Sequence, residues 1–328
     1  MHRYFSLNAH LRRLFGKRVQ KIPMDAGFSC PNRDGSISAQ GCAFCNPSGS
    51  GSGLADSMDL ATQWDHWRER LGRKYKADLF LAYLQSYTNT YGPPERIAEV
   101  LDALRDLPAL GGVCVGTRPD CLDEGKIELL ASLKRRPEVR TVMVELGLQS
   151  SCDATLSHIN RGHTAADFVS ATRLASEHGL DVVAHVVAGL PSPNGRETAD
   201  DLVDTVRFVA SLPVSGIKFH NLYVCRDTLV GQWWKEGRFA PMPLDEYLDG
   251  VARSLELLPP EVVIHRLHGD PAGDELLAPD WAGDRNRLLN AVRTHLEQTD
   301  TWQGKRNGAE AGPPSFWDPN SKENRNAG

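Results

Sequence analysis

Strand-like and helix-like hydrophobic patterns alternate along most of the chain. Short, nearly continuous apolar runs are typical of strands buried on both faces of a parallel sheet. They cover residues 19–24, 79–85, 112–116, 141–148, 181–188, 216–222 and 261–267. Between them, apolar residues recur every three or four positions, as helices require. The predicted helices cover residues 58–75, 94–107, 123–135, 164–178, 197–211 and 244–258.

This rhythm of strand–helix units predicts an α/β fold with a parallel sheet. Six units in series favour a barrel or partial barrel, and an open, doubly wound sheet is the alternative. In a barrel, functional side chains gather at the carboxyl ends of the strands. Polar or glycine-rich segments do follow the predicted strands, after Met24 and Gln85 and over residues 116–120 and 189–193. We therefore expect the functional site at that end of the sheet.

The chain divides into four predicted parts: a basic N-terminal segment (1–18), a core barrel (19–225), a C-terminal extension packed on the core (226–303) and a tail (304–328). The polar, Gly- and Pro-containing composition of the tail predicts disorder. Basic side chains near the N-terminus predict either contacts with phosphate groups or the solvated face of an amphipathic helix. They are Arg3, Arg12, Arg13, Lys17, Arg18 and Lys21.

Composition narrows the functional class. The 328 residues, 41% hydrophobic and 24% charged, can bury one large core or two smaller ones. A net charge of -5 argues against a protein that is basic throughout and coats nucleic acid, while a local basic patch stays compatible with it. No apolar run approaches the roughly 18 residues of a membrane span, and residues 1–6 lack a signal-peptide core. We expect a cytoplasmic protein without membrane association.

Three of the seven cysteines, Cys30, Cys42 and Cys45, are clustered in the sequence. In a reducing cytosol, such a cluster is more typical of a metal or redox site than of disulfides. The C-x-x-C spacing of the last two lets their thiolates converge on one metal site. Three thiolates on a [4Fe–4S] cluster, which usually takes four, would leave one iron open for chemistry.

Two other interpretations of these cysteines stay open on spacing alone. A structural zinc ion would need a fourth ligand, for which His66, Cys114 and Cys121 are candidates. A C-x-x-C redox pair is the other interpretation, although the surrounding sequence is unlike a thioredoxin. The neighbouring motifs favour the iron–sulfur interpretation.

The segment CAFC (42–45) has an aromatic residue before its last cysteine, and it resembles the end of the radical S-adenosylmethionine (SAM) signature. The first gap of that signature is usually three residues, and here it is eleven. The longer gap, with GFSCPNRDG at 27–35, resembles the YhcC/YtqA-like family of Elp3-related radical SAM proteins. The resemblance runs from about residue 4 to 303. The segments that carry it are LQSYTNTYGPPE (84–95), VGTRPDC (115–121), VELGLQS (144–150), INRGH (159–163), HVVAGLP (185–191) and GIKFHNLYV (216–224).

The resemblance implies a radical SAM fold, a partial (β/α)6 barrel of the TIM type with a C-terminal extension. It also implies that Cys30, Cys42 and Cys45 hold a [4Fe–4S] cluster whose open iron binds SAM. In this superfamily one electron from the cluster cleaves SAM to a 5′-deoxyadenosyl radical, so the protein supplies placement and electrostatics. An electron donor of the flavodoxin or ferredoxin type is the expected partner. No single catalytic side chain is identified.

Three residues are expected near the ends of the bound SAM molecule. The resemblance places the adenine between the backbone of Phe44 and the strand end at Gly189, where glycine admits close approach. It places the methionyl carboxylate on Arg161, whose guanidinium has the matching fork geometry. A helix-capping surface arginine is the alternative role for Arg161.

Three more residues are expected along the middle of SAM. The turn that contains Thr88 matches the segment whose carbonyls bind the SAM amino group, with ordinary turn chemistry as the alternative. Glu145 and Gln149 share one face of the fourth strand. A buried carboxylate needs partners, which for Glu145 are either ribose hydroxyls and the SAM ammonium or a structural ion pair.

Other polar residues at the expected barrel mouth are weaker candidates. Arg118 and Asp120 follow the third strand, and helix capping is an alternative role for Asp120. Side chains that either line a substrate cavity or are structural are Lys218, His220, His265, Arg266 and His268. Cys121 is either a second reactive thiol or part of the core. Cys114, Cys152 and Cys225 are expected to be structural.

The substrate is less constrained than the activation chemistry. Elp3-like relatives act on the wobble uridine of tRNA, so tRNA is the leading expectation, although a shared fold is a weak warrant for a shared substrate. A small metabolite is the alternative substrate. A non-catalytic protein that carries zinc or a cluster is the alternative of a different class.

Overall fold

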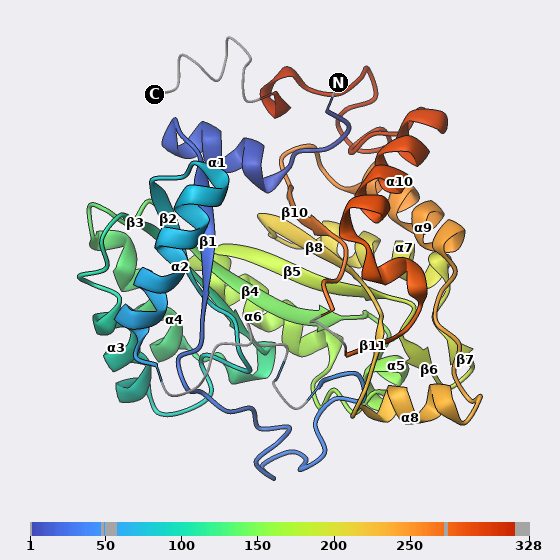
Figure 1. Ribbon diagram of the computed structural model, residues 1–328, viewed down its shortest axis with the longest axis horizontal. Coiled ribbons are helices and arrows are strands. Elements are labelled where there is room, and N and C mark those ends of the chain that lie inside the picture. Colours follow the sequence, from blue (N-terminus) through green and yellow to red (C-terminus); the bar gives the residue numbers. More distant parts are fainter. Residues whose placement is uncertain (1, 47–48, 50–57, 272–274, 319–328) are drawn as a thin grey trace.

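The computed structural model describes residues 2–46, 49, 58–271 and 275–318. Seven parallel strands form one curled sheet (Figure 1). In spatial order they are β1 (Val19–Met24), β2 (Leu79–Leu84), β3 (Leu110–Thr117), β4 (Thr141–Gln149), β5 (Asp181–Ala188), β8 (Gly216–Asn221) and β10 (Val263–Leu267). Each predicted strand is present, and the last one joins the same sheet from the C-terminal part of the chain.

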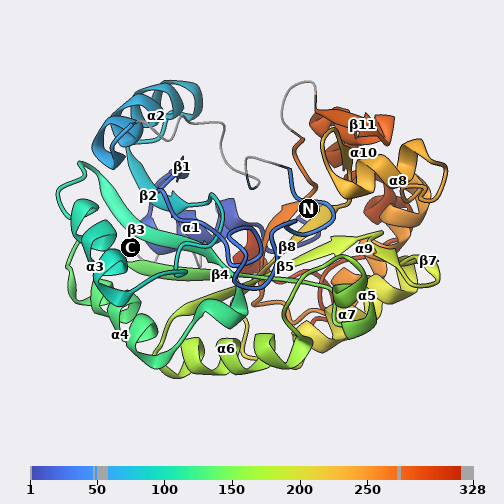
Figure 2. The same cartoon turned by 90° about the horizontal axis from the view of Figure 1, so that it is seen from below.

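Helices cover the convex side of this sheet (Figure 2). They are α2 (Leu60–Tyr75), α3 (Pro94–Ala103), α4 (Glu124–Ser132), α6 (Ala165–Glu177), α7 (Ala199–Ala210) and α9 (Leu244–Leu257). A doubly wound sheet carries helices on both faces. The arrangement therefore confirms the partial barrel and not the open sheet. No described helix combines the length and apolar character needed to cross a membrane.

The helix α1 (Leu7–Phe15) closes the end of the barrel opposite the cysteine loop (Figure 1). Its Leu11 packs into an apolar layer across the barrel, formed with Val19, Leu81, Cys114, Met143 and Val183. Arg12 and Arg13 lie in its last turn, as the amphipathic-helix interpretation requires, and their contact with phosphate groups stays a prediction. Lys21 lies on β1 and points into the barrel, where it pairs with Glu145. The expectation that Lys21 contacts phosphates at the surface is therefore wrong.

Shorter elements complete the fold around the carboxyl ends of the strands. They are α5 (Asp153–His158), β6 (Pro191–Ser192), β7 (Gly195–Arg196), β9 (Val224–Cys225), α8 (Leu229–Lys235), β11 (Leu276–Ala278) and α10 (Arg285–Gln298). The strands β9 and β11 pair antiparallel. This pairing ties the C-terminal part of the chain to the rim of the barrel.

The described part of the tail is packed, so the prediction of disorder from residue 304 is wrong for residues 304–318. Trp317 is 1% exposed, and its indole N–H donates to the Pro260 carbonyl at 2.9 Å. Phe316 packs edge-to-face on Phe5, with ring centroids 5.2 Å apart. The segment is polar on average, which predicted disorder, but these two aromatic side chains bury enough apolar area to pack it against the domain. Residues 319–328, which carry the rest of that prediction, lie outside the described residues.

Candidate functional site

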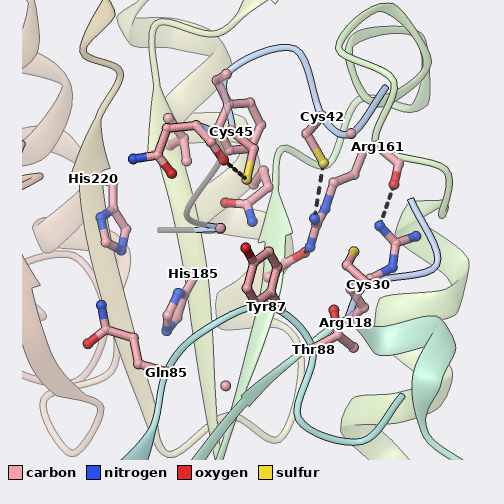
Figure 3. A pocket seen from close by; sticks show the side chains of 18 of the residues that line it. Cys30, Cys42, Cys45, Gln85, Tyr87, Thr88, Arg118, Arg161, His185 and His220 are labelled. Carbon is pink, nitrogen blue, oxygen red and sulfur yellow. Dashed lines mark hydrogen bonds between the residues drawn. The ribbon is translucent and has the colours of Figure 1, made fainter. Parts of the chain in front are cut away.

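A cavity of about 320 Å³ opens at the carboxyl ends of the strands, as predicted. The loop between β1 and α2 brings Cys30, Cys42 and Cys45 to one end of it (Figure 3). His185 and His220 lie on the opposite side in the same view. The cavity therefore has a sulfur-lined end and an end lined by side chains from the barrel interior.

The three cysteine sulfurs are not all as close to one another as the ligands of a single zinc ion. Four thiolates on one zinc ion, each about 2.3 Å from it in a tetrahedron, lie about 3.8 Å apart. In the described residues, the one group of three or more His, Cys, Asp or Glu side chains whose ligand atoms lie within 4.8 Å is Glu124, Glu128 and His178 at the surface. Cys30, Cys42 and Cys45 are described and do not form such a group. At least one of the three sulfur–sulfur distances therefore exceeds 4.8 Å.

Nitrogen donors lie beside two of the three cysteine sulfurs. Asn32 Nδ2 and Arg161 Nη1 each lie 3.4 Å from Cys42 Sγ, and Arg33 Nη2 lies 3.2 Å from Cys45 Sγ. N–H groups and positive charge stabilise sulfur ligands in the thiolate form that binds metal. The three residues therefore suit the requirements of a metal–thiolate site.

Burial and the negative charge of Cys42 raise the pKa of the Cys45 thiol, and Arg33 opposes this effect. Arg33 is held in place by the carbonyl oxygens of Cys45 and Asn46, to which Nη2 also donates. The Asn46 side chain in turn donates to Glu275 Oε2 at 2.8 Å, across from the C-terminal part of the chain. The loop is thus fixed at its last cysteine by contacts from two directions.

Arg161 is 8% exposed, so the alternative of a surface capping residue is wrong. Besides its contact with Cys42, Nη2 donates to the Gly147 carbonyl at 2.8 Å. Its Nε donates to His163 Nε2 at 2.9 Å. Burial and the charge of Arg161 lower the pKa of His163 to about 3, so this ring is neutral and accepts the hydrogen bond. Arg161 is therefore oriented between the cysteines and the end of β4.

Arg118 reinforces the same corner of the site. It is 2% exposed, and Nη1 donates to the Arg161 carbonyl at 2.8 Å. Its Nε and Nη2 bind both carboxylate oxygens of Asp120, at 2.9 and 2.7 Å. The helix that follows is capped by Asp123, which accepts from the Lys126 N–H at 3.0 Å. Helix capping by Asp120 is therefore wrong, because its carboxylate holds Arg118.

Glu145 lies at the centre of an ion-pair network inside the barrel. Its carboxylate binds Lys21 Nζ at 2.5 Å, His185 Nε2 at 3.0 Å and Lys218 Nζ at a short distance. Lys218 also donates to the Tyr83 hydroxyl at 3.1 Å. The structure thus shows the ion pair that was the alternative for Glu145, and contact with SAM stays a prediction.

Burial and the charges of neighbouring groups shift the pKa values in this network and so set which of its groups are charged. The two lysines and His185 hold the pKa of the Glu145 carboxyl well below its usual range, although burial opposes them. Burial lowers the pKa of Lys218 to about 8 and that of His185 to about 4. Near pH 7 the network therefore contains two ammonium groups, one carboxylate and a neutral imidazole.

The other residues expected to bind SAM divide into two groups. Phe44, Thr88 and Gln149 line the cavity, as do Glu145 and Arg161. Gly189 is not among the lining residues. Its φ of +79° and the Met242 Cβ, 2.9 Å from any added Cβ, explain why the position needs glycine. The contacts of these residues with SAM stay predictions.

The weaker candidates also divide by position. Lys218, His220 and Arg266 line the cavity. His265 and His268 do not: the first lies 3.4 Å from Lys21 Nζ, and the second contacts Asp270 at 3.3 Å. Cys114 and Cys121 are buried, whereas Cys152 is exposed. Cys225 is buried but lines the cavity.

Comparison with known proteins decides the family. The model of the radical SAM superfamily matches residues 35–209, and that of the radical SAM C-terminal domain matches residues 214–298. The chain belongs to the radical SAM superfamily. The uncharacterized protein YtqA of Bacillus subtilis is 36% identical over 304 residues, covering 92% of each chain. This similarity confirms the radical SAM family predicted from the cysteine motif.

Two further proteins are similar to part or most of this chain. The solved structure of Elp3 from the archaeon Methanocaldococcus infernus superposes with a TM-score of 0.66 at 19% identity, covering 87% of this chain and 64% of that one. It shows that the fold is shared. A tRNA uridine(34) acetyltransferase of Dehalococcoides mccartyi is 35% identical over 189 residues, which is 57% of this chain and 38% of the relative.

The sequence interpretation missed several residues of this radical SAM site. Arg33 follows Cys30 by three residues, and its closeness in sequence could have drawn attention to it. Lys21 and Tyr83 are polar positions in apolar strands, a signal comparable to the one that singled out Glu145. The contact of Asn46 with Glu275 joins residues 229 positions apart, and no local pattern indicates it.

Proposed function

We propose that this radical SAM protein holds a [4Fe–4S] cluster on Cys30, Cys42 and Cys45 and cleaves SAM reductively. The observation that supports it most is the convergence of the three cysteines at one end of a cavity, where Cys42 and Cys45 receive N–H donors. When bound, the cluster supplies the electron that converts SAM to methionine and a 5′-deoxyadenosyl radical. The match to the radical SAM superfamily disfavours a structural zinc protein.

We propose that Arg161 binds the methionyl carboxylate of SAM. An arginine has five N–H groups, and three of those of Arg161 donate to Cys42, His163 and Gly147. One N–H remains on each terminal nitrogen, which matches the two oxygens of a carboxylate. Arg118 positions this guanidinium through the backbone carbonyl of Arg161.

Gln149 and Thr88 are proposed to bind the polar middle of SAM. Both line the cavity, on β4 and on the turn after β2. Gln149 has a φ of 78°, and the register with β5 shifts between Gly147 and Gln149. This local irregularity directs the end of β4 away from a regular strand path, as is common beside functional sites. Phe44 is proposed to contact the adenine, and Gly189 to approach it through the backbone.

We propose that the substrate is tRNA, modified at the wobble uridine. The support is the similarity of 57% of this chain to an enzyme named for uridine 34 of tRNA. A flavodoxin or ferredoxin is proposed as the electron donor, because the cluster must be reduced before SAM is cleaved.

Mass spectrometry of tRNA nucleosides tests the proposed substrate. A strain that lacks this protein is compared with the same strain complemented by wild type or by a Cys45→Ala variant. The proposal predicts a wobble-uridine modification that is lost in the deletion, restored by wild type and not restored by the variant. Identical nucleoside profiles in all strains would overturn the tRNA assignment and leave a small metabolite as the substrate to be sought.

A further inference from the structure

The barrel interior carries more positive charge than its carboxylate neutralises. Lys21 is bound at 2.5 Å to one oxygen of Glu145, and Lys218 is bound to the other. In the described part of the chain, neither lysine has a second carboxylate at salt-bridge distance. One carboxylate thus serves two buried ammonium groups. A buried charge without a partner is unfavourable, so this network is suited to a further anion.

A second cation lies next to Lys218. The two residues occupy paired positions on neighbouring strands, Lys218 on β8 and Arg266 on β10. Like charges at such positions repel each other. Arg266 contacts Asp270 only at 3.9 Å, and Asp270 is shared with His268 at 3.3 Å and Arg285 at 3.9 Å. The pair of cations is therefore weakly compensated.

Both cations face the cavity, away from its sulfur-lined end. Lys218 and Arg266 line it together with the neutral His185 and His220. Figure 3 shows these two imidazoles across the pocket from Cys30 and Arg118. The side chain of Lys218 is only 7% exposed, so its ammonium group lies in a largely desolvated part of the cavity. Desolvation strengthens the attraction between a cation and a bound anion.

We propose that Lys218 and Arg266 bind an oxyanion, a phosphate or a carboxylate, of the molecule on which the radical acts. The inference rests on the proposed function, because it assigns this end of the cavity to the substrate and the sulfur-lined end to SAM. The oxyanion bridges the two cations and removes their repulsion. A nucleotide and an acidic metabolite both offer such a group.

Calorimetry with simple anions tests the site. The protein carries its reconstituted cluster and saturating SAM, under anaerobic conditions, and is titrated with sulfate and with acetate at ionic strength held constant with potassium chloride. We expect saturable binding of at least one anion. The variants Lys218→Gln and Arg266→Met should each weaken it by about ten- to a hundred-fold, as expected for the loss of a charge-assisted hydrogen bond.

Arg285→Met is the matched control, because Arg285 also contacts Asp270 at 3.9 Å but does not line the cavity. It should bind the anion as wild type does, and Lys218→Arg should stay within a few-fold of wild type. Circular dichroism verifies that each variant is folded. Titration with uridine monophosphate and with uridine identifies the source: tighter binding of the nucleotide assigns the group to a phosphate, and preference for acetate over sulfate assigns it to a carboxylate.

Three results would overturn the inference: no saturable anion binding by wild type, equal weakening in Arg285→Met, or loss of SAM affinity in place of anion affinity in the Lys218 and Arg266 variants. Formation of 5′-deoxyadenosine from SAM alone is measured in the same samples. Wild type that forms it without binding an anion refutes this inference and leaves the proposed function standing. Wild type that never forms it refutes the proposed function itself.

Discussion

The guanidinium of Arg33 donates a hydrogen bond to the sulfur of Cys45, with Nη2 3.2 Å from Sγ. The same nitrogen donates to two backbone carbonyls of that loop, so its position is fixed by three contacts. Hydrogen bonds to the sulfurs and nearby charge help to set the reduction potential of an iron–sulfur cluster. In the proposed cluster site, Arg33 would therefore stabilise the reduced state of the cluster.

Replacing Arg33 should shift the cluster potential. We expect Arg33→Met to make the midpoint potential more negative, because a positive charge and an N–H donor at Cys45 are lost. Arg68→Met is the control, since Arg68 pairs with Asp65 on the surface of α2. Redox titration of the reconstituted protein followed by electron paramagnetic resonance measures the effect. Equal potentials for Arg33→Met and wild type would contradict this role.

Single cysteine substitutions test which thiols bind the proposed cluster, and Cys225 provides the control. Cys30→Ala, Cys42→Ala and Cys45→Ala should each lose the four-iron cluster, because three thiolates are its only protein ligands in the proposal. Cys225→Ser should keep it, although Cys225 lines the same cavity. Cys114→Ser and Cys152→Ser should keep it too. Iron content and visible absorbance after anaerobic reconstitution decide the matter, and a folded Cys225→Ser protein without iron would show that the ligand set is wrong.

Arg161 should affect SAM more than the cluster. We expect Arg161→Ala to bind SAM about ten- to a hundred-fold more weakly, because a charge-assisted bidentate contact is lost. Iron content should stay near that of wild type, since the cysteines remain. Anaerobic calorimetry with SAM measures the affinity. Unchanged affinity would place the carboxylate elsewhere.

Anion binding by Lys218 should depend on pH. Sulfate keeps its charge between pH 7 and 9.5, so a change in its affinity reports on the protein. The pKa of Lys218 is lowered to about 8. The ammonium that binds the anion is present below that value and lost above it, so binding should weaken as the pH rises through about 8 in wild type. The Lys218→Arg variant should show no such change in calorimetric titrations, and a flat wild-type profile would contradict the prediction.

The groups that surround Lys218 do not share this transition. The pKa of His185 is about 4, those of His220 and His265 are lowered by burial well below 6.5, and that of Cys114 is raised to about 11. Burial raises the pKa of Tyr83 well above 10. The pKa of Glu145 is lowered and that of Lys21 is raised, so both stay charged.

Much of the fold could be predicted from the sequence because its signals are local. Apolar runs indicated the strands of the sheet, and helical spacing indicated the helices that cover it, with small differences at their ends. The helices α5, α8 and α10 were not predicted. The start of α6 illustrates such a local signal, because Thr164 and Asp167, three residues apart, form a capping box there. The cysteine motif was equally local, and it led to the correct superfamily.

The parts of the site that could not be predicted depend on contacts distant in the sequence. Lys21 and Glu145 are 124 residues apart, and their pairing follows from the curl of the sheet. Lys21 lies on an edge strand, and the sequence does not show which face of that strand points into the barrel. Its charge therefore suggested, wrongly, a contact at the surface. Trp317 is a similar case, since its partner is the Pro260 carbonyl 57 residues earlier.

Reductive cleavage of SAM is the most direct test of the central claim. Anaerobically reconstituted protein is reduced with dithionite, mixed with SAM and analysed by chromatography for 5′-deoxyadenosine and methionine. Wild type should form both products in equal amounts, slowly even without substrate, and Cys45→Ala should form none. Wild type with a full, reducible cluster that forms no 5′-deoxyadenosine, even with cellular RNA and metabolite extract added, would contradict the account.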